Sequence, residues 1–274
     1  MIHLVARLGA PGLSFGTWIR TSLHFREAPF LTIQTTSIWM PRAGSLHAPA
    51  IDTLMRNSLL ALAAACVLAQ VILIAGLFLP RQRRPRFSPM WRWIAISAFA
   101  AGMVWMTIVA ENLWAIIRLT NATENAVHVE VTGVQFQWYF RYPGPDRIYG
   151  ATKPNLIDAP GANPLGLDPA DPHGRDDIVS SVLVLPVDRQ AQILLRAQDV
   201  VHGFFIPGMR MMQNATPGAT SRIHLTPTRM GDYPILCSQL CGLGHYRMHA
   251  VLRVVSDRDF SAWMAQREVL NAGR

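Results

Sequence analysis

Two long runs of apolar residues constrain this chain more than any other feature of its sequence. The first covers residues 59–79 and contains no charged side chain. The second covers residues 91–117 and is interrupted only by Arg92 at its start and Glu111 near its end. A helix rises 1.5 Å per residue, so about 20 apolar residues cross a hydrocarbon layer of about 30 Å. We therefore expect a transmembrane helical hairpin over residues 57–118, since two such runs disfavour buried helices of a large soluble protein.

The connector between the two runs carries four arginines, at positions 81, 83, 84 and 86. Cytoplasmic loops of membrane proteins are enriched in Lys and Arg. We therefore expect a cytoplasmic connector in a bacterial inner membrane, with the C-terminal region, 119–274, on the periplasmic side. Residues 1–56 are also rich in arginine and poor in acids, which indicates a disordered leader or extension. The sequence leaves open a processed leader or a start at Met40 or Met55.

The formal net charge of +8 comes entirely from the first part of the chain. Residues 1–118 contain eleven arginines against three acids, whereas residues 119–274 contain fourteen basic and fourteen acidic residues. A nucleic-acid-binding face on the C-terminal region therefore has no support, and we expect no nucleic-acid partner. Three cysteines are too few for a disulfide-based scaffold.

Beyond residue 119 the hydrophobic period changes to two, which is typical of β-strands. Strand-like runs cover residues 127–132, 134–140, 179–187, 190–196, 220–225, 232–237 and 250–255. Short strands separated by turn residues predict a β-sandwich or barrel. Residues 143–177 are too rich in Pro, Gly and Asp for regular structure, and a short helix is expected to begin at Asp257.

The aromatic run 134–140 has a two-sided pattern. Because side chains alternate along a strand, Phe136, Trp138 and Phe140 are expected on one face. Tyr139 and Arg141 are expected on the other face, together with the neighbouring glutamines.

One segment near the C-terminus concentrates metal-binding side chains. It contains Cys237, Cys241, His245 and Met248 within a short stretch, and His202 stands upstream in an Asp-Val-Val-His run. Thiolate, thioether and imidazole ligands together favour a copper electron-transfer site. With two thiols on one loop, both sulfurs can bridge two copper ions, each of which ends in one histidine. A structural zinc site leaves the methionine without a role, and a disulfide between the cysteines is the other alternative.

These segments together resemble one known family. The hairpin, the run Gly133-Val-Gln-Phe-Gln-Trp-Tyr-Phe-Arg-Tyr142, Gln213-Asn-Ala-Thr-Pro-Gly218 and the cysteine loop are similar to cytochrome c oxidase subunit II. The resemblance implies an α+β membrane protein with a two-helix hairpin, an all-β cupredoxin-like domain and a short C-terminal helix. It implies a dinuclear copper A centre, because the candidate ligands occur in the same order along the chain as in the family. The implied ligands are Cys237 and Cys241 as bridges, His202 and His245 as terminal ligands, Met248 as a weak axial ligand and the backbone carbonyl of Gln239.

The resemblance also implies a function in the respiratory chain. Such a subunit accepts electrons from cytochrome c and passes them to haem in subunit I, where oxygen is reduced to water with proton pumping. Subunit I, subunit III, the membrane and cytochrome c are the implied partners, and Phe136, Trp138 and Tyr139 are candidates for receiving the electron. A copper A subunit of a nitric oxide reductase is the nearest alternative, and a membrane-anchored copper-storage protein is a further one.

Three positions depart from the family pattern. Gln239 stands where the family often has a glutamate that reaches magnesium at the subunit I boundary, which argues against magnesium here. No acid lies between residues 53 and 110, so the family's glutamate at a proton-channel mouth is missing. Arg141 replaces a common acid, from which we expect a donor-docking face that is not strongly acidic.

Overall fold

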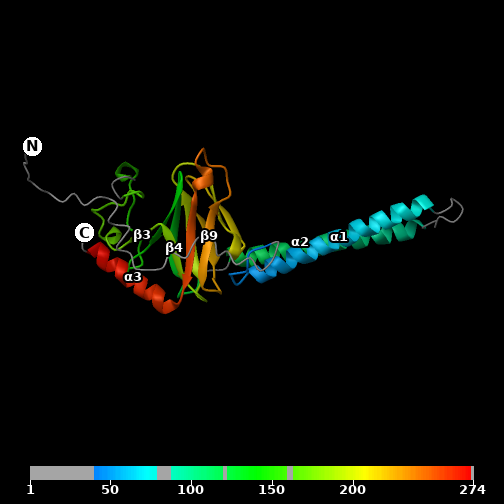
Figure 1. Ribbon diagram of the computed structural model, residues 1–274, viewed down its shortest axis with the longest axis horizontal. Helices are drawn as coiled ribbons and strands as arrows, with labels where there is room; N and C mark the ends of the chain where they lie inside the picture. Colours follow the sequence, from blue (N-terminus) through cyan, green and yellow to red (C-terminus); the bar gives the residue numbers. More distant parts are fainter. Residues whose placement is uncertain (1–39, 79–87, 120–121, 159–162, 273–274) are drawn as a thin grey trace, which may run out of the picture. The chain divides into compact units, whose positions relative to one another are not determined.

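The computed structural model describes residues 40–78, 88–119, 122–158 and 163–272 (Figure 1). Every helix and strand lies in one compact unit, Arg42–Arg274. The arginine-rich connector and most of the predicted leader lie outside the described residues.

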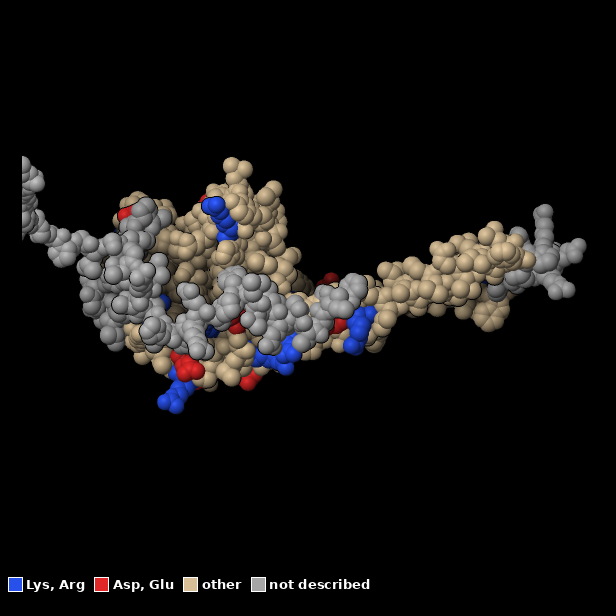
Figure 2. All heavy atoms as spheres, in the orientation of Figure 1, with Lys and Arg blue, Asp and Glu red and all other residues tan. Residues whose placement is uncertain are grey.

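Two long helices confirm the predicted hairpin. Helix α1 spans Ala48–Phe78 and helix α2 spans Pro89–Leu119, and the two run side by side (Figure 1). Ser58 Oγ lies 3.2 Å from Met106 Sδ across the pair. Both helices are long and apolar enough to cross a membrane, and the most apolar stretch of each has no residue buried within the protein. Figure 2 shows few charged side chains along the hairpin.

Helix α1 begins inside the region expected to be a leader, 1–56. The segment before it is held by hydrogen bonds to distant parts of the chain. Gly44 N donates to the Gly208 carbonyl over 2.8 Å, and Ser45 Oγ donates to the Met209 carbonyl over 2.8 Å. Residues 44–47 therefore belong to the folded part of the chain, although they lie upstream of the apolar run.

Two five-stranded sheets form the rest of the fold. The first has the strand order β3-β2-β1-β5-β8 and the second has the order β4-β10-β9-β6-β7. Their strands are β1 (Val127–Val134), β2 (Gln137–Tyr142), β3 (Ile178–Ser180), β4 (Val182–Pro186), β5 (Ala191–Ala197), β6 (His202–Ile206), β7 (Met211–Ala215), β8 (Ser221–Leu225), β9 (Gly231–Cys237) and β10 (His249–Val255). Pairing is antiparallel except for β1 with β5 and β4 with β10. Helix α3 (Asp257–Ala272) closes the chain.

The core lies between the sheets, as the alternation of residues predicts. Strand β5 buries every second residue, and both sheets contribute to one apolar cluster. Trp138 and Phe140 have no exposed surface. Burial of such side chains is the main stabilising contribution to a sandwich of this kind. The predicted β-sandwich is confirmed, and β6 and β7 are strands that the sequence pattern did not indicate.

Arg141 was expected to influence the charge of a donor-docking face, but it is buried, with only 1% of it accessible. Its Nε donates to Asp177 Oδ2 over 2.9 Å, and its Nη2 donates to the Gly150 carbonyl over 2.5 Å. The insertion 143–177 folds over the outer face of β2 and supplies both partners. This residue therefore adds no charge to a docking surface.

Candidate metal centre

The loop between β9 and β10 and the start of β6 form the candidate site. Strands β6 and β9 are antiparallel neighbours, with Phe204 opposite Cys237. His202 begins β6 and Cys237 ends β9, so both lie at the same end of the sheet. The loop is closed by hydrogen bonds from Cys237 N to the Met248 carbonyl, 3.2 Å, and from Ser238 N to the Gly203 carbonyl, 2.9 Å.

The structure brings the sulfur atoms of the loop together. Cys237 Sγ and Cys241 Sγ are 3.8 Å apart. Cys241 Sγ also lies 3.6 Å from His245 Nδ1 and 3.8 Å from Met248 Sδ. The backbone carbonyl oxygen of Gln239 is 3.2 Å from Cys237 Sγ. These five residues therefore present soft donors and one carbonyl oxygen to a common space.

His202 completes this cluster from the other strand. It has no exposed surface, and its ligand atom and the two thiol sulfurs all lie within 4.8 Å of one another. Its Nε2 lies 2.8 Å from Asp199 Oδ1, whereas its Nδ1 is buried and has no hydrogen-bond partner among the described residues. A metal-binding histidine commonly uses one ring nitrogen for the metal and the other for a carboxylate. The unpartnered nitrogen therefore fits a metal ligand.

The Cys241 thiol is protonated in the metal-free protein. Burial, and then the neighbouring Cys237, raise the pKa of the Cys241 thiol to about 11. At neutral pH the metal-free thiol therefore keeps its proton. A metal ion exchanges for that proton, because the thiolate is the form that binds metal.

Asp199 is a residue that sequence reasoning did not single out. Burial opposes ionisation of its carboxyl, but hydrogen bonds from His202 and from the backbone N–H groups of Gln135 and Val200 hold its pKa below the ordinary value. It therefore stays charged and fixes the orientation of the imidazole. Its position three residues before His202 is the only signal that the sequence contains.

Aromatic side chains surround the histidine. The Trp138 ring contacts His202 and Phe204 edge to face, with centroid separations of 5.8 and 5.1 Å. A Cβ at Gly133 would lie 2.9 Å from the His202 ring, so only glycine permits this approach. Phe136 is 36% exposed. Its ring lies where a Cβ at Gly244 would stand, which places it against the cysteine loop.

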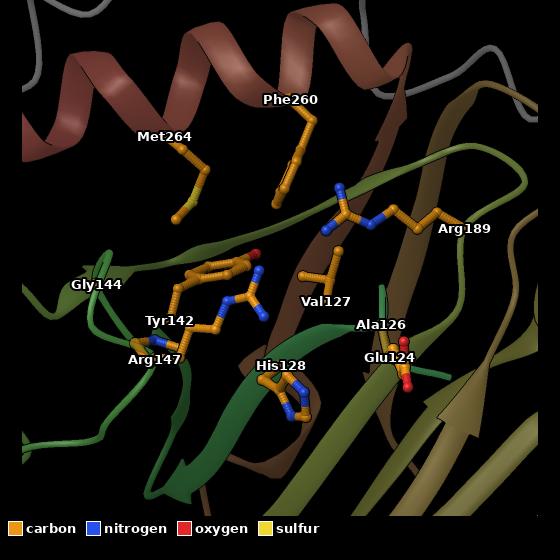
Figure 3. A pocket seen from close by; sticks show the side chains of 11 residues that line it. Glu124, Ala126, Val127, His128, Tyr142, Gly144, Arg147, Arg189, Phe260 and Met264 are labelled. Atoms are coloured by element: carbon orange, nitrogen blue, oxygen red, sulfur yellow. The ribbon is translucent and has the colours of Figure 1, made fainter. Parts of the chain in front are cut away.

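A second concavity lies away from these ligands, under helix α3 (Figure 3). It has a volume of about 130 Å³ and is lined by the rings of Tyr142 and Phe260 and by the side chains of Arg147, Arg189 and His128 among others. Figure 3 shows the two guanidinium groups approaching it from different sides. Its lining contains one imidazole and no thiol, so it lacks the ligand set of the metal cluster.

Comparison with known proteins finds similarity to subunit II of cytochrome c oxidases. The sequence profile of the family described as "Cytochrome C oxidase subunit II, periplasmic domain" matches residues 128–255. The "Alternative cytochrome c oxidase subunit 2" of Bradyrhizobium diazoefficiens is 38% identical over 146 residues, which are 53% of this chain and 52% of that protein. The "Cytochrome c oxidase subunit 2" of Candida albicans is 32% identical over 151 residues, 53% of each chain. The chain therefore spans about half the length of these relatives.

A solved structure gives a weaker likeness. The periplasmic domain of subunit II of cytochrome oxidase from Bradyrhizobium japonicum superposes with a TM-score of 0.40 and 23% identity. The match covers 54% of this chain and 97% of that domain. The relationship therefore rests on residues 128–255 and on the sequence relatives. Residues 128–255 match the periplasmic domain of the cytochrome c oxidase subunit II family.

Proposed function

We propose that this chain is the electron-accepting subunit II of a cytochrome c oxidase. It takes electrons from cytochrome c at a dinuclear copper A centre and passes them to haem in subunit I, where oxygen is reduced to water with proton pumping. The observation that carries this proposal is the thiol pair of Cys237 and Cys241, 3.8 Å apart and beside the unpartnered nitrogen of His202.

Six residues of this chain are the proposed copper ligands, and they have three different roles. We assign Cys237 and Cys241 as the residues that would bridge two copper ions, and His202 and His245 as those that would be terminal ligands. Met248 and the Gln239 carbonyl would be the weak axial ligands. A copper pair held by these residues would supply one-electron transfer to and from the chain.

The surroundings of this loop suit contact with an electron donor. Leu240, Leu243 and Tyr246 are 78%, 98% and 76% exposed, although all three are large apolar or aromatic residues. Exposed apolar patches mark contact surfaces of proteins. Phe136 lies against the same loop and Trp138 against His202, so we propose that the electron enters through these two rings. Tyr139, next to Trp138 in β2, is the third candidate.

We propose that α1 and α2 span a bacterial inner membrane with their arginine-rich connector in the cytoplasm and the β-domain in the periplasm. The apolar length of both helices supports this orientation together with the periplasmic type of the domain. Subunit I, and beside it subunit III, would contact the hairpin. Gln239 provides no negative charge, so we do not assign a magnesium ion to its side chain.

Two other functions use the same ligands. A nitric oxide reductase with a copper A subunit differs in the gas that its catalytic subunit consumes, and gas uptake by the purified complex separates it from an oxidase. A membrane-anchored copper-storage protein would bind copper without exchanging electrons with a cytochrome.

Electron acceptance is tested by stopped-flow mixing of a reduced cytochrome c with the copper-loaded full-length chain. We expect oxidation of the cytochrome and simultaneous bleaching of the visible absorption of the centre. Phe136→Ala is expected to slow this reaction without loss of copper, because the side chain lies outside the ligand set. A loaded chain that leaves the cytochrome reduced would contradict the proposal and favour storage.

A further inference from the structure

One residue outside the ligand set contacts both halves of the metal centre. Gln135 lies in the turn between β1 and β2. Its backbone N–H donates to Asp199 Oδ2 over 2.7 Å, and its side-chain Nε2 donates to the Cys241 carbonyl oxygen over 2.5 Å. Asp199 in turn holds His202 through its other oxygen, 2.8 Å from Nε2. A single residue is therefore joined to the histidine side and to the cysteine side.

The cysteine loop is shaped to receive this amide. Gly242 has a φ of +134°, a conformation that favours glycine. A Cβ at this position would lie 2.8 Å from Gln135 Nε2 and 3.2 Å from the ring of Phe136. Only a residue without a side chain therefore lets the loop reach the turn. The same approach brings Phe136 onto the loop.

The two hydrogen bonds join segments that are far apart in sequence. Gln135 is 64 residues from Asp199 and 106 residues from Cys241. The bond to the carboxylate is charge-assisted, which makes it stronger than a bond between neutral groups. By contrast, the next glutamine of the same hairpin, Gln137, begins β2 and is exposed, and its side chain forms no hydrogen bond with the described residues.

We propose that Gln135 is a positioning residue of the metal centre, which sets the separation between His202 and Cys241. This inference rests on the proposed copper function, because it concerns the geometry in which the copper pair is held. A glutamine that only closed the hairpin would need neither the contact with Cys241 nor the space left by Gly242.

The test compares Gln135→Met with Gln137→Met in the full-length chain. Methionine keeps the length of the side chain and removes the amide. In the copper-loaded protein we measure the rate of copper release to excess EDTA, the visible absorption and the electron paramagnetic resonance spectrum. Gln135→Met is expected to release copper roughly threefold to tenfold faster, the effect of losing one net hydrogen bond. It is also expected to shift both spectra, while Gln137→Met matches the wild type.

Gln135→Glu sharpens the result, because a carboxylate there would face the Cys241 carbonyl oxygen. We expect faster release than from Gln135→Met. Gln135→Asn, which keeps an amide but is too short to reach the loop, serves if the methionine variant does not fold. Release rates and spectra equal to those of the wild type in the folded Gln135 variants would overturn the inference.

A separate measurement distinguishes failure of this inference from failure of the proposed function. If the wild-type chain takes up no copper, the function fails, and the role of Gln135 is examined in the metal-free chain by amide hydrogen exchange. The loop from Cys241 to Met248 is expected to exchange faster in Gln135→Met than in Gln137→Met. Equal exchange would overturn the positioning role.

Discussion

Two buried polar clusters lie in the same β-domain, and they differ in whether their charges balance within the chain. The first, the ion cluster, joins Arg141 to Asp177 and Glu130, with Arg196 3.2 Å from the same glutamate. The second is the metal cluster of thiols, thioether and imidazoles. The ion cluster contains two cations and two carboxylates, so its charges balance within the chain.

The metal cluster has no such balance. It gathers neutral electron-pair donors around a common space, and His202 Nδ1 has no partner among the described residues. A buried polar atom without a partner costs free energy. The comparison indicates that the ion cluster balances its charges within the chain, whereas the metal cluster is an uncharged set of soft donors that supports the proposal of a bound cation.

The largest expected effect is the loss of copper binding when a residue of the metal cluster is replaced. Cys241→Ser should abolish the spin signal shared by two coppers, because a hydroxyl does not replace a bridging thiolate. The free energy of unfolding of the metal-free chain should change by only about 1 kcal/mol, since Ser nearly matches Cys in size. Metal analysis, electron paramagnetic resonance and urea unfolding measure these quantities. Retention of the full signal would show that Cys241 is not a bridge.

The second effect concerns stability rather than metal. Arg141→Met should lower the free energy of unfolding by about 3–5 kcal/mol, because it leaves buried carboxylates without their cation. Arg141 is 1% exposed and Asp177 has no exposed side-chain surface. The matched control is Arg253→Met, which breaks a half-exposed pair with Asp232 and should cost at most about 1 kcal/mol. Urea unfolding followed by circular dichroism compares the two, and equal losses would contradict the distinction.

The smallest effect tests a surface pair in the insertion. His173 Nδ1 lies 2.6 Å from Asp146 Oδ2, and that hydrogen bond chiefly raises the pKa of the histidine and lowers that of the carboxyl. The raised histidine pKa gives stabilisation below about pH 6.5 that is lost as pH rises through the folded value. The lowered carboxyl pKa gives stabilisation above about pH 4 that is lost as pH falls through its folded value.

The pair should therefore hold the insertion most firmly between about pH 4 and 6.5. A nuclear magnetic resonance titration of the His173 ring measures its pKa directly. We expect a higher midpoint in the wild type than in Asp146→Asn. The same midpoint in both proteins would show that the pair does not form in solution.

The sequence alone predicted the features that local patterns encode. The apolar runs predicted the hairpin, and the period of two predicted most strands. The residue pattern indicated Cys237, Cys241, His245 and Met248 on one loop and His202 upstream as candidate ligands. The resemblance to the family added the Gln239 carbonyl. The start of α1 was not predicted, because its apolar run begins later than its polar contacts.

Features that depend on distant segments were not predictable. Alternation did not reveal that Arg141 is buried, because its partners Gly150 and Asp177 lie in the segment that follows β2. The contacts of Gln135 with Asp199 and Cys241 cross 64 and 106 residues, so no local pattern encodes them. Strands β6 and β7 are stabilised mainly by pairing with each other and, for β6, with β9. Their residues carry no clear alternation, so tertiary context decides their conformation.

The most direct test of this account is the metal content of the full-length chain, extracted from its membrane without added metal. Elemental analysis gives the number and kind of ions per chain, and electron paramagnetic resonance shows how they share electrons. We predict two coppers per chain with one unpaired electron spread equally over both. One zinc and no copper, or copper ions with separate and localised signals, would contradict the central claim that Cys237 and Cys241 bridge a copper pair.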